Sequence, residues 1–218
     1  MPNDLGYPAL GWSRSGIADT GEAVLQQVAQ PSVEPITLLE ARAHLKVDAT
    51  AEDALIYAWI QAARQHVEGA TRRAMLPQDW ELRLSSFPRR GEAVDLPLPP
   101  FIAVLSVSTY DAAGEATLIA ADGYQVEAPG GDFAPSARMY PGSAGLWPVA
   151  VAGVRGAIRI RYRAGYFSPG AVPAPLRAAM FLIIGDLYEN REGSLNRNIQ
   201  TNPTVERLVD PFRLPRVR

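Results

Sequence analysis

The stretch that decides the fold runs from Asp53 to Arg73 and reads DALIYAWIQAARQHVEGATRR. Its apolar residues recur every three or four positions, as on one face of an α-helix. They form two neighbouring stripes, Leu55, Ala58, Trp59, Ala62 and His66 beside Ile56, Ile60, Ala63, Val67 and Ala70. Because much of this surface is alanine, another helix can approach it closely. The pattern predicts a long central helix from about Thr50 to Arg73.

Helix signals also lie before and after this run. Thr37-Leu38-Leu39-Glu40 has the spacing of a capping box and predicts a short helix that ends near Lys46. Pro173-Ala174-Pro175 precedes a third predicted helix, from about Leu176 to Arg191, since proline is tolerated in a first turn. The middle of that helix is apolar nearly all round, which predicts burial on most sides.

From Pro77 onward the apolar period changes to two, which is typical of strands. The clearest strand spans 157–163, where Ile158, Ile160 and Tyr162 alternate with three arginines. One face is therefore expected to point inward and to leave the guanidinium groups outside. Shorter antiparallel strands are predicted near residues 80–84, 94–98, 102–110, 117–119 and 124–127.

The two ends of the chain lack a clear period. Residues 1–35 are rich in small and polar residues and predict an extended or partly ordered arm. The segment from Leu195 to Arg218 contains five arginines and two acidic residues, Glu206 and Asp210, so its net charge is +3. Its three prolines disfavour a continuous helix. The predicted fold class is α+β: a small helical bundle core with a β-rich antiparallel insertion and extended N- and C-terminal arms. Its expected parts are an N-terminal arm (1–35), a helical core (36–75 and 172–192), a β-rich insertion (76–171) and a C-terminal tail (193–218).

Composition excludes several classes of protein. The 218-residue chain has no cysteine, so disulfides, thiolate nucleophiles and cysteine-based metal sites are ruled out. The formal charge of -2 gives no broad basic field of the kind that free nucleic-acid binders use. No apolar run approaches the roughly eighteen residues of a membrane span. The first residues lack the basic and apolar regions of a secretory signal.

No catalytic, cofactor-binding or metal-binding residue is predicted, and no cofactor. His44 and His66 lack the spacing of metal ligands, so core or surface positions are expected. Asp186 and Glu189 stand one helical turn apart, but no nucleophile or oxyanion donor accompanies them. The glycine-containing stretches at 129–131 and 141–145 lack the spacing of a phosphate-binding loop.

Three stretches, taken together, resemble a known family. The first is ITLLEARAHL (36–45), followed by DALI (53–56). The second is Trp80-Glu81-Leu82, and the third is IRYRAGY (160–166), followed by VPAPLRAA (172–179) and LYENRE (187–192). Their order and spacing resemble the head–tail connector (adaptor) family of long-tailed bacteriophages and phage-like gene-transfer particles. The similarity covers about residues 36–192.

The resemblance implies a structural protein and not an enzyme. Members of the family assemble as a ring, commonly twelvefold, beneath the portal of a DNA-filled capsid. The implied partners are therefore further copies of this chain, the portal protein, and a stopper or tail-completion protein. Packaged DNA would pass through the ring without sequence-specific binding, and no membrane is involved. The implied location is the head–tail junction of a virion or phage-like particle that is assembled in the bacterial cytoplasm.

Two sets of residues are candidates for partner contacts. The tail combines aromatic, aliphatic and guanidinium groups that are enriched in interfaces. Its expected contacts with the portal or a neighbouring subunit are Arg197, Arg207, Phe212, Arg213, Leu214 and Arg216. The arginine strand supplies candidate subunit contacts at Arg159, Arg161 and Arg163, with a solvated face paired to cross-strand acids or a contact with DNA as alternatives. The alternative functions are a nucleic-acid-binding module that uses this strand and the basic tail, and a hydrolase with a carboxylate pair.

Overall fold

A computed structural model describes residues 23–88, 91–143, 145–151, 153–190 and 202–215. Its helices are α1 (Leu38–Leu45), α2 (Asp53–Thr71), α3 (Ala174–Glu189) and α4 (Pro203–Val209). Its strands are β1 (Val24–Ala29), β2 (Gln78–Leu84), β3 (Val94–Leu96), β4 (Phe101–Tyr110), β5 (Ala116–Leu118), β6 (Tyr124–Glu127), β7 (Ala137–Pro141) and β8 (Ile158–Ala164). Short 3-10 turns are η2 (Ala121–Gly123), η3 (Pro169–Ala171) and η4 (Asp210–Phe212).

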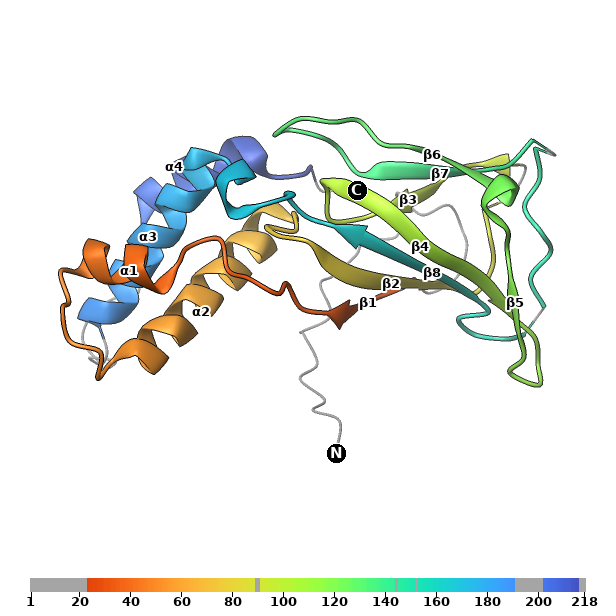
Figure 1. Cartoon of the computed structure of the whole chain (residues 1–218). Coiled ribbons are helices and arrows are strands. Elements are labelled where there is room, and N and C mark those ends of the chain that lie inside the picture. Colours follow the sequence, from red (N-terminus) through yellow and green to blue (C-terminus); the bar gives the residue numbers. More distant parts are fainter. Residues whose placement is uncertain (1–22, 89–90, 144, 152, 191–201, 216–218) are drawn as a thin grey trace.

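Helices gather at one end of the molecule and strands at the other (Figure 1). All strand pairs are antiparallel within the described residues, so the predicted α+β class is confirmed. The division into a helical core and a β-rich insertion at the stated boundaries stays a prediction.

Helix α1 begins at the predicted capping box. The Thr37 hydroxyl accepts a hydrogen bond from the Glu40 backbone N–H at 3.2 Å, and the Glu40 carboxylate accepts from the Thr37 N–H at 2.8 Å. The helix ends where Lys46 takes the left-handed conformation, with φ of 56°. Both ends agree with the sequence prediction, because capping depends on local hydrogen bonds.

The helical end is organised around α3, which packs against α1, α2 and α4. Helix α2 buries one of its two predicted stripes there, the one made of Ile56, Ile60, Ala63 and Val67. The other stripe is largely outside: Ala58 and Ala62 are exposed, and Leu55 is 44% exposed. The tertiary arrangement therefore selects between two neighbouring stripes that both contain apolar residues at helical spacing.

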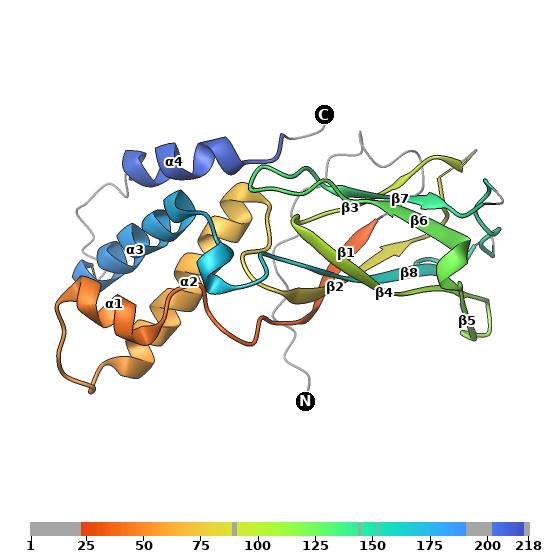
Figure 2. The same cartoon turned by 45° about the horizontal axis from the view of Figure 1, so that its top comes forward.

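The strands form two sheets that pack face to face (Figure 2). One sheet has five strands in the order β1-β2-β8-β4-β5, and the other has three in the order β3-β7-β6. Between them lie buried side chains from both sheets, among them Leu82, Ile160 and Met139. The buried Tyr162 hydroxyl of β8 donates to the Pro97 carbonyl oxygen at 3.0 Å and so links the five-stranded sheet to the segment after β3. The result is a small β-sandwich.

Strand β8 leads back to the helices through Gly165. Its φ is 135°, a conformation that side chains disfavour. A Cβ atom there would also lie 2.0 Å from the Leu76 carbonyl oxygen. Only glycine fits this close approach between β8 and the segment before β2.

The N-terminal arm contains a strand that the sequence pattern did not predict. Strand β1 pairs antiparallel with β2 and forms one edge of the five-stranded sheet. Its side chains alternate between exposed and half-buried positions, starting with Val24 and Leu25. The sequence signal for this strand is weak. An edge strand is hydrogen-bonded to a neighbouring strand on one side only, and its position depends on packing against that neighbour.

The C-terminal segment also differs from the prediction, because residues 203–212 are helical and packed. Pro203 begins α4 and does not interrupt it, since a first-turn proline needs no hydrogen-bond donor. Asn202 caps the helix by accepting from the Thr204 backbone N–H at 3.0 Å. Val205, Val209 and Phe212 are buried in the helical core. The expectation of a wholly extended tail is therefore wrong for this part.

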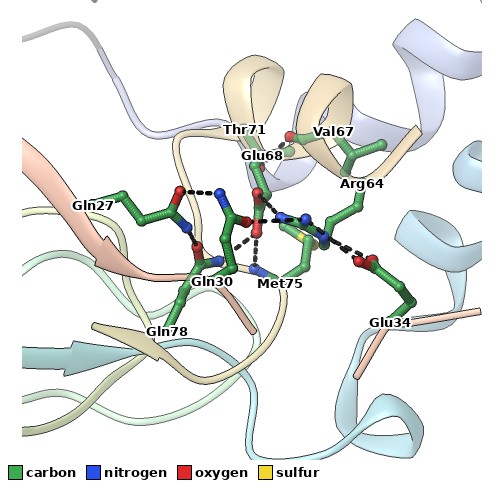
Figure 3. A network of polar contacts seen from close by, with 9 residues as sticks. All are labelled: Gln27, Gln30, Glu34, Arg64, Val67, Glu68, Thr71, Met75 and Gln78. Atoms are coloured by element: carbon green, nitrogen blue, oxygen red, sulfur yellow. Dashed lines mark hydrogen bonds and ion pairs between the residues drawn. The ribbon is translucent and has the colours of Figure 1, made fainter. Parts of the chain in front are cut away.

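A buried polar network joins the helices to the sandwich (Figure 3). The Arg64 side chain of α2 is only 2% exposed. Its Nε lies 2.8 Å from a carboxylate oxygen of Glu34, and its Nη1 lies 2.9 Å from one of Glu68. Burial would lower the pKa of Arg64, but the charges of Glu68 and Glu34 outweigh it and raise that pKa above its ordinary value.

The other oxygen of Glu68 connects this ion pair to the sheet. It accepts hydrogen bonds from the Met75 backbone N–H at 2.9 Å and from the Gln78 side chain at 2.5 Å. Gln78, the first residue of β2, accepts in turn from Gln27 of β1. The arm, the central helix and the first paired strands are thus fixed relative to one another by one chain of contacts.

We expect Arg64→Leu to lower the free energy of unfolding by about 3–5 kcal/mol, because it leaves two largely buried carboxylates without their cation. Gln65→Ala, on the exposed side of the same helix, should change it by less than about 0.5 kcal/mol. Urea unfolding at neutral pH measures both. Equal effects would show that the network contributes no specific stability.

Phe212→Ala is expected to lower the free energy of unfolding by about 3–5 kcal/mol, since Phe212 is 4% exposed. Its ring also stacks on Phe133, with the centroids 4.9 Å apart. Thermal melting compares it with Arg207→Ala, which alters an exposed side chain of α4 and should leave the midpoint nearly unchanged. An unaffected midpoint in Phe212→Ala would contradict the packed position of this segment.

Candidate partner-binding surface

The outward face of the five-stranded sheet carries a row of arginines. Residues that lie opposite one another in an antiparallel pair share a face. The register of β2 with β8 pairs Asp79 with Arg163, Glu81 with Arg161 and Arg83 with Arg159. We call these six residues the guanidinium face; it has four guanidinium groups and two carboxylates, an excess of two positive charges.

Glu81 is the centre of this face. It is 1% exposed, and its two oxygens accept hydrogen bonds from the Nε atoms of Arg83 and Arg161, each at 2.6 Å. Burial would raise the pKa of Glu81, but the hydrogen bonds and charges of Arg161 and Arg83 outweigh it and hold that pKa below its ordinary value. Glu81 is therefore ionised and fixes the two guanidinium groups on either side of it.

The other two arginines of the face also have partners within the chain. Arg163 binds Asp79 through two parallel contacts, Nε to Oδ1 at 2.6 Å and Nη2 to Oδ2 at 3.0 Å. The guanidinium of Arg159 lies 4.0 Å from the ring centroid of Tyr110, a cation–π contact. The cross-strand acids considered as an alternative are thus present. A subunit contact through Arg159, Arg161 and Arg163 stays a prediction.

The tail residues divide into three groups. Arg197 and Arg216 lie outside the described residues. Phe212 is buried, and its carbonyl oxygen accepts from Nε of the buried Arg73 at 2.6 Å, so its expected role as an anchor in a partner is corrected to one in the chain's own core. Arg213 pairs with Glu206 and with Asp210. Arg213 is nevertheless exposed, as is Arg207, and Leu214 is half-buried, so these three form the third group and remain candidates.

Sequence patterns did not single out Asp79, Glu81 and Arg83 as part of the site. A signal was present, because charged residues alternate with Trp80 and Leu82 in the same way as the arginines of β8 alternate with apolar residues. What the sequence did not show is that these two strands are neighbours. Their pairing turns two alternating patterns into one surface.

Other sequence candidates stand apart from this surface. His66 is exposed, and the exposed His44 packs its ring against Phe181, with the centroids 5.1 Å apart. Asp186 and Glu189 are both exposed on α3. Across the described ranges, no group of three or more potential metal ligands is found. None of the helices described is long and apolar enough to cross a membrane.

Comparison with known proteins agrees with this architecture. The model of the family described as "Phage gp6-like head-tail connector protein" matches residues 35–116. No curated protein sequence matches. A chain in the neck of an empty gene transfer agent (GTA) particle, computed with C6 symmetry, is 26% identical with a TM-score of 0.73, and the match covers 88% of this chain and 96% of that chain.

Two further solved structures match over the same 88% of this chain and 96% of theirs. One is the virion of a native GTA particle, with 26% identity and a TM-score of 0.73. The other is the neck of a native GTA particle computed with C12 symmetry, with 27% identity and a TM-score of 0.71. The predicted resemblance to the head–tail connector family is confirmed. The chain is a structural protein of the virion connector class.

We expect Glu81→Gln to lower the free energy of unfolding at pH 7 by about 1 kcal/mol, because the two guanidinium groups are partly solvated. A lowered carboxyl pKa stabilises the fold above the ordinary value of about 4.3, and this contribution is lost as the pH falls through the lowered pKa. The variant should therefore lose less stability between pH 7 and strongly acidic pH than the unmodified protein. Urea unfolding across this range measures it.

Glu127→Gln is the matched control, since Glu127 is exposed on the other sheet. If Glu81→Gln and Glu127→Gln have the same pH profile, the arginines do not hold Glu81 in its charged form.

Proposed function

We propose that this chain is a head–tail adaptor that forms a ring between the portal and the tail or stopper proteins, at the head–tail junction of a virion or phage-like particle. The observation that carries the proposal is the fold shared with GTA neck chains over 96% of their length. The C6 and C12 symmetries of those particles support a ring of identical copies. Assembly of the particle would take place in the bacterial cytoplasm.

The function requires assembly and no chemical reaction. The family match supports a structural and non-enzymatic role. Packaged DNA would pass through the ring, and the chain's formal charge of -2 suits a passage that does not hold phosphates. This favours the adaptor over a nucleic-acid-binding module.

Docking on the portal is assigned to the C-terminal segment. Of the predicted contact residues that the structure describes, Arg207 and Arg213 are exposed and Leu214 is half-buried, so these three have accessible surface for such a contact. The Leu214 backbone N–H donates to the Thr71 carbonyl oxygen at 3.2 Å, so the segment directly after η4 is held at the C-terminal end of α2. A partner that receives this segment would thereby be tied to α2.

Deletion of the gene in the bacterium or phage that encodes it tests the proposal. We expect DNA-filled heads and free tails in place of joined particles, because the neck between them is incomplete. Electron microscopy of the purified particles counts both forms, and expression of the full chain from a second copy should restore joined particles. Normal numbers of tailed particles without the chain would refute the adaptor function.

A further inference from the structure

The guanidinium face has hydrogen-bond donors that the chain itself does not use. Arg83 and Arg161 each donate a hydrogen bond to Glu81 through Nε, and within the described residues neither donates one through its Nη amino groups. The Arg161 side chain is 51% exposed and that of Arg83 is 38% exposed. A guanidinium that is held at one edge can still bind a second anion through its other nitrogens.

The surroundings leave this side of the arginines open. The register of β4 with β8 places Ala103, Ser106 and Ser108 opposite Arg163, Arg161 and Arg159. These side chains are short, so a partner can reach the guanidinium groups from the β4 side. On the β1 side, Val24 lies opposite Arg83 and is 48% exposed, which adds an apolar contact. Arginine beside apolar surface is typical of protein interfaces.

The other outer face of the sandwich has the opposite charge. In the three-stranded sheet, Asp95 pairs with Arg138, and Arg138 pairs with Glu127 in the strand register. All three alternate with inward residues of the core, so they point outward. Asp122 is exposed in the turn before β6. We call Asp95, Arg138 and Glu127 the carboxylate face; together with the neighbouring Asp122 it has an excess of two negative charges.

The carboxylate face also has unused hydrogen-bonding capacity. Glu127 accepts only from the Tyr140 hydroxyl, at 3.2 Å, among the described residues. Asp95 is 38% exposed, and Oδ1 is its oxygen that lies 3.3 Å from Nε of Arg138. The two outer faces thus lie on opposite sides of the sandwich and carry excess charges of equal number and opposite sign.

We propose that the guanidinium face of one copy binds the carboxylate face of the next copy in the ring. This inference rests on the proposed adaptor function. A ring of identical chains needs two different surfaces that meet head to tail, and opposite sides of one protomer meet that requirement. Complementary charge also sets the direction of the ring, because two guanidinium faces repel each other.

DNA fits the guanidinium face less well than protein does. Its two carboxylates, Glu81 and Asp79, already offset two of the four guanidinium charges, so the face attracts phosphates only weakly. Tight binding to a duplex commonly uses about 6–10 phosphate contacts, more than the four arginines supply. Carboxylates of a protein partner need only the few Nη groups that are free.

Chemical cross-linking tests the contact, and the chain suits it because it has no cysteine of its own. Ser106→Cys places a thiol on the guanidinium face, and Gln125→Cys places one on the outer side of β6, beside Glu127. Particles carrying the double variant are treated with a short bismaleimide and separated on a denaturing gel. We expect a ladder at multiples of the 23.6 kDa chain.

The matched control pairs Ser106→Cys with Ala113→Cys, which lies exposed in the turn after β4 and away from the carboxylate face. It should stay monomeric. A ladder in the control, or none in the test pair while the chain is present in the neck, overturns the proposed contact and leaves the adaptor function standing. Absence of the chain from the neck refutes the adaptor function, and the contact with it.

Charge reversal gives an independent readout. Arg161→Glu should reduce tailed particles about tenfold or more through like-charge repulsion, and adding Glu127→Arg should restore them at least in part. A melting curve of each purified variant separates misfolding from lost contact. No rescue by Glu127→Arg in a folded variant overturns the pairing. Salt-sensitive binding of duplex DNA by the full chain that Arg161→Glu abolishes would also overturn it, in favour of a nucleic-acid contact.

Discussion

The buried guanidinium of Arg64 is the interaction on which the arrangement of this protein depends. It lies between two carboxylates that come from different parts of the chain, Glu34 after the first strand and Glu68 one turn further along α2. Charges in a protein interior are tolerated only when each is paired and hydrogen-bonded. The position of the arm relative to the central helix is therefore determined by electrostatics as well as by apolar packing.

This constraint extends from the helices into the sandwich. Glu68 also accepts a hydrogen bond from the side chain of Gln78, the first residue of β2. Gln78 in turn accepts one from Gln27 of the edge strand. The orientation of the five-stranded sheet thus follows from the same network that holds α2. Because the guanidinium face is the outward side of that sheet, its direction relative to the helices is set from inside the molecule.

For a connector, a rigid link between the two ends has a mechanical consequence. The helical end carries the C-terminal segment, and the sandwich carries two faces of opposite charge. If the helical end and the sandwich moved freely, contacts made by one end would not orient the other. Each copy would then lose more conformational entropy on joining a ring. A fixed geometry lets identical copies repeat the same contact with the same rotation.

Local features were determined by the sequence itself: the capping box of α1, the central helix, and the alternation of β8 all follow from hydrogen bonds and periods within a few residues. Its motif order also pointed to the connector family. Only the tertiary structure decided which stripe of α2 is buried, that residues 24–29 become a strand, and that Phe212 belongs to the core. It also decided that Glu81 lies between two arginines. Each of these depends on a neighbour far away in the chain, and a local pattern contains no information about which surface will cover it.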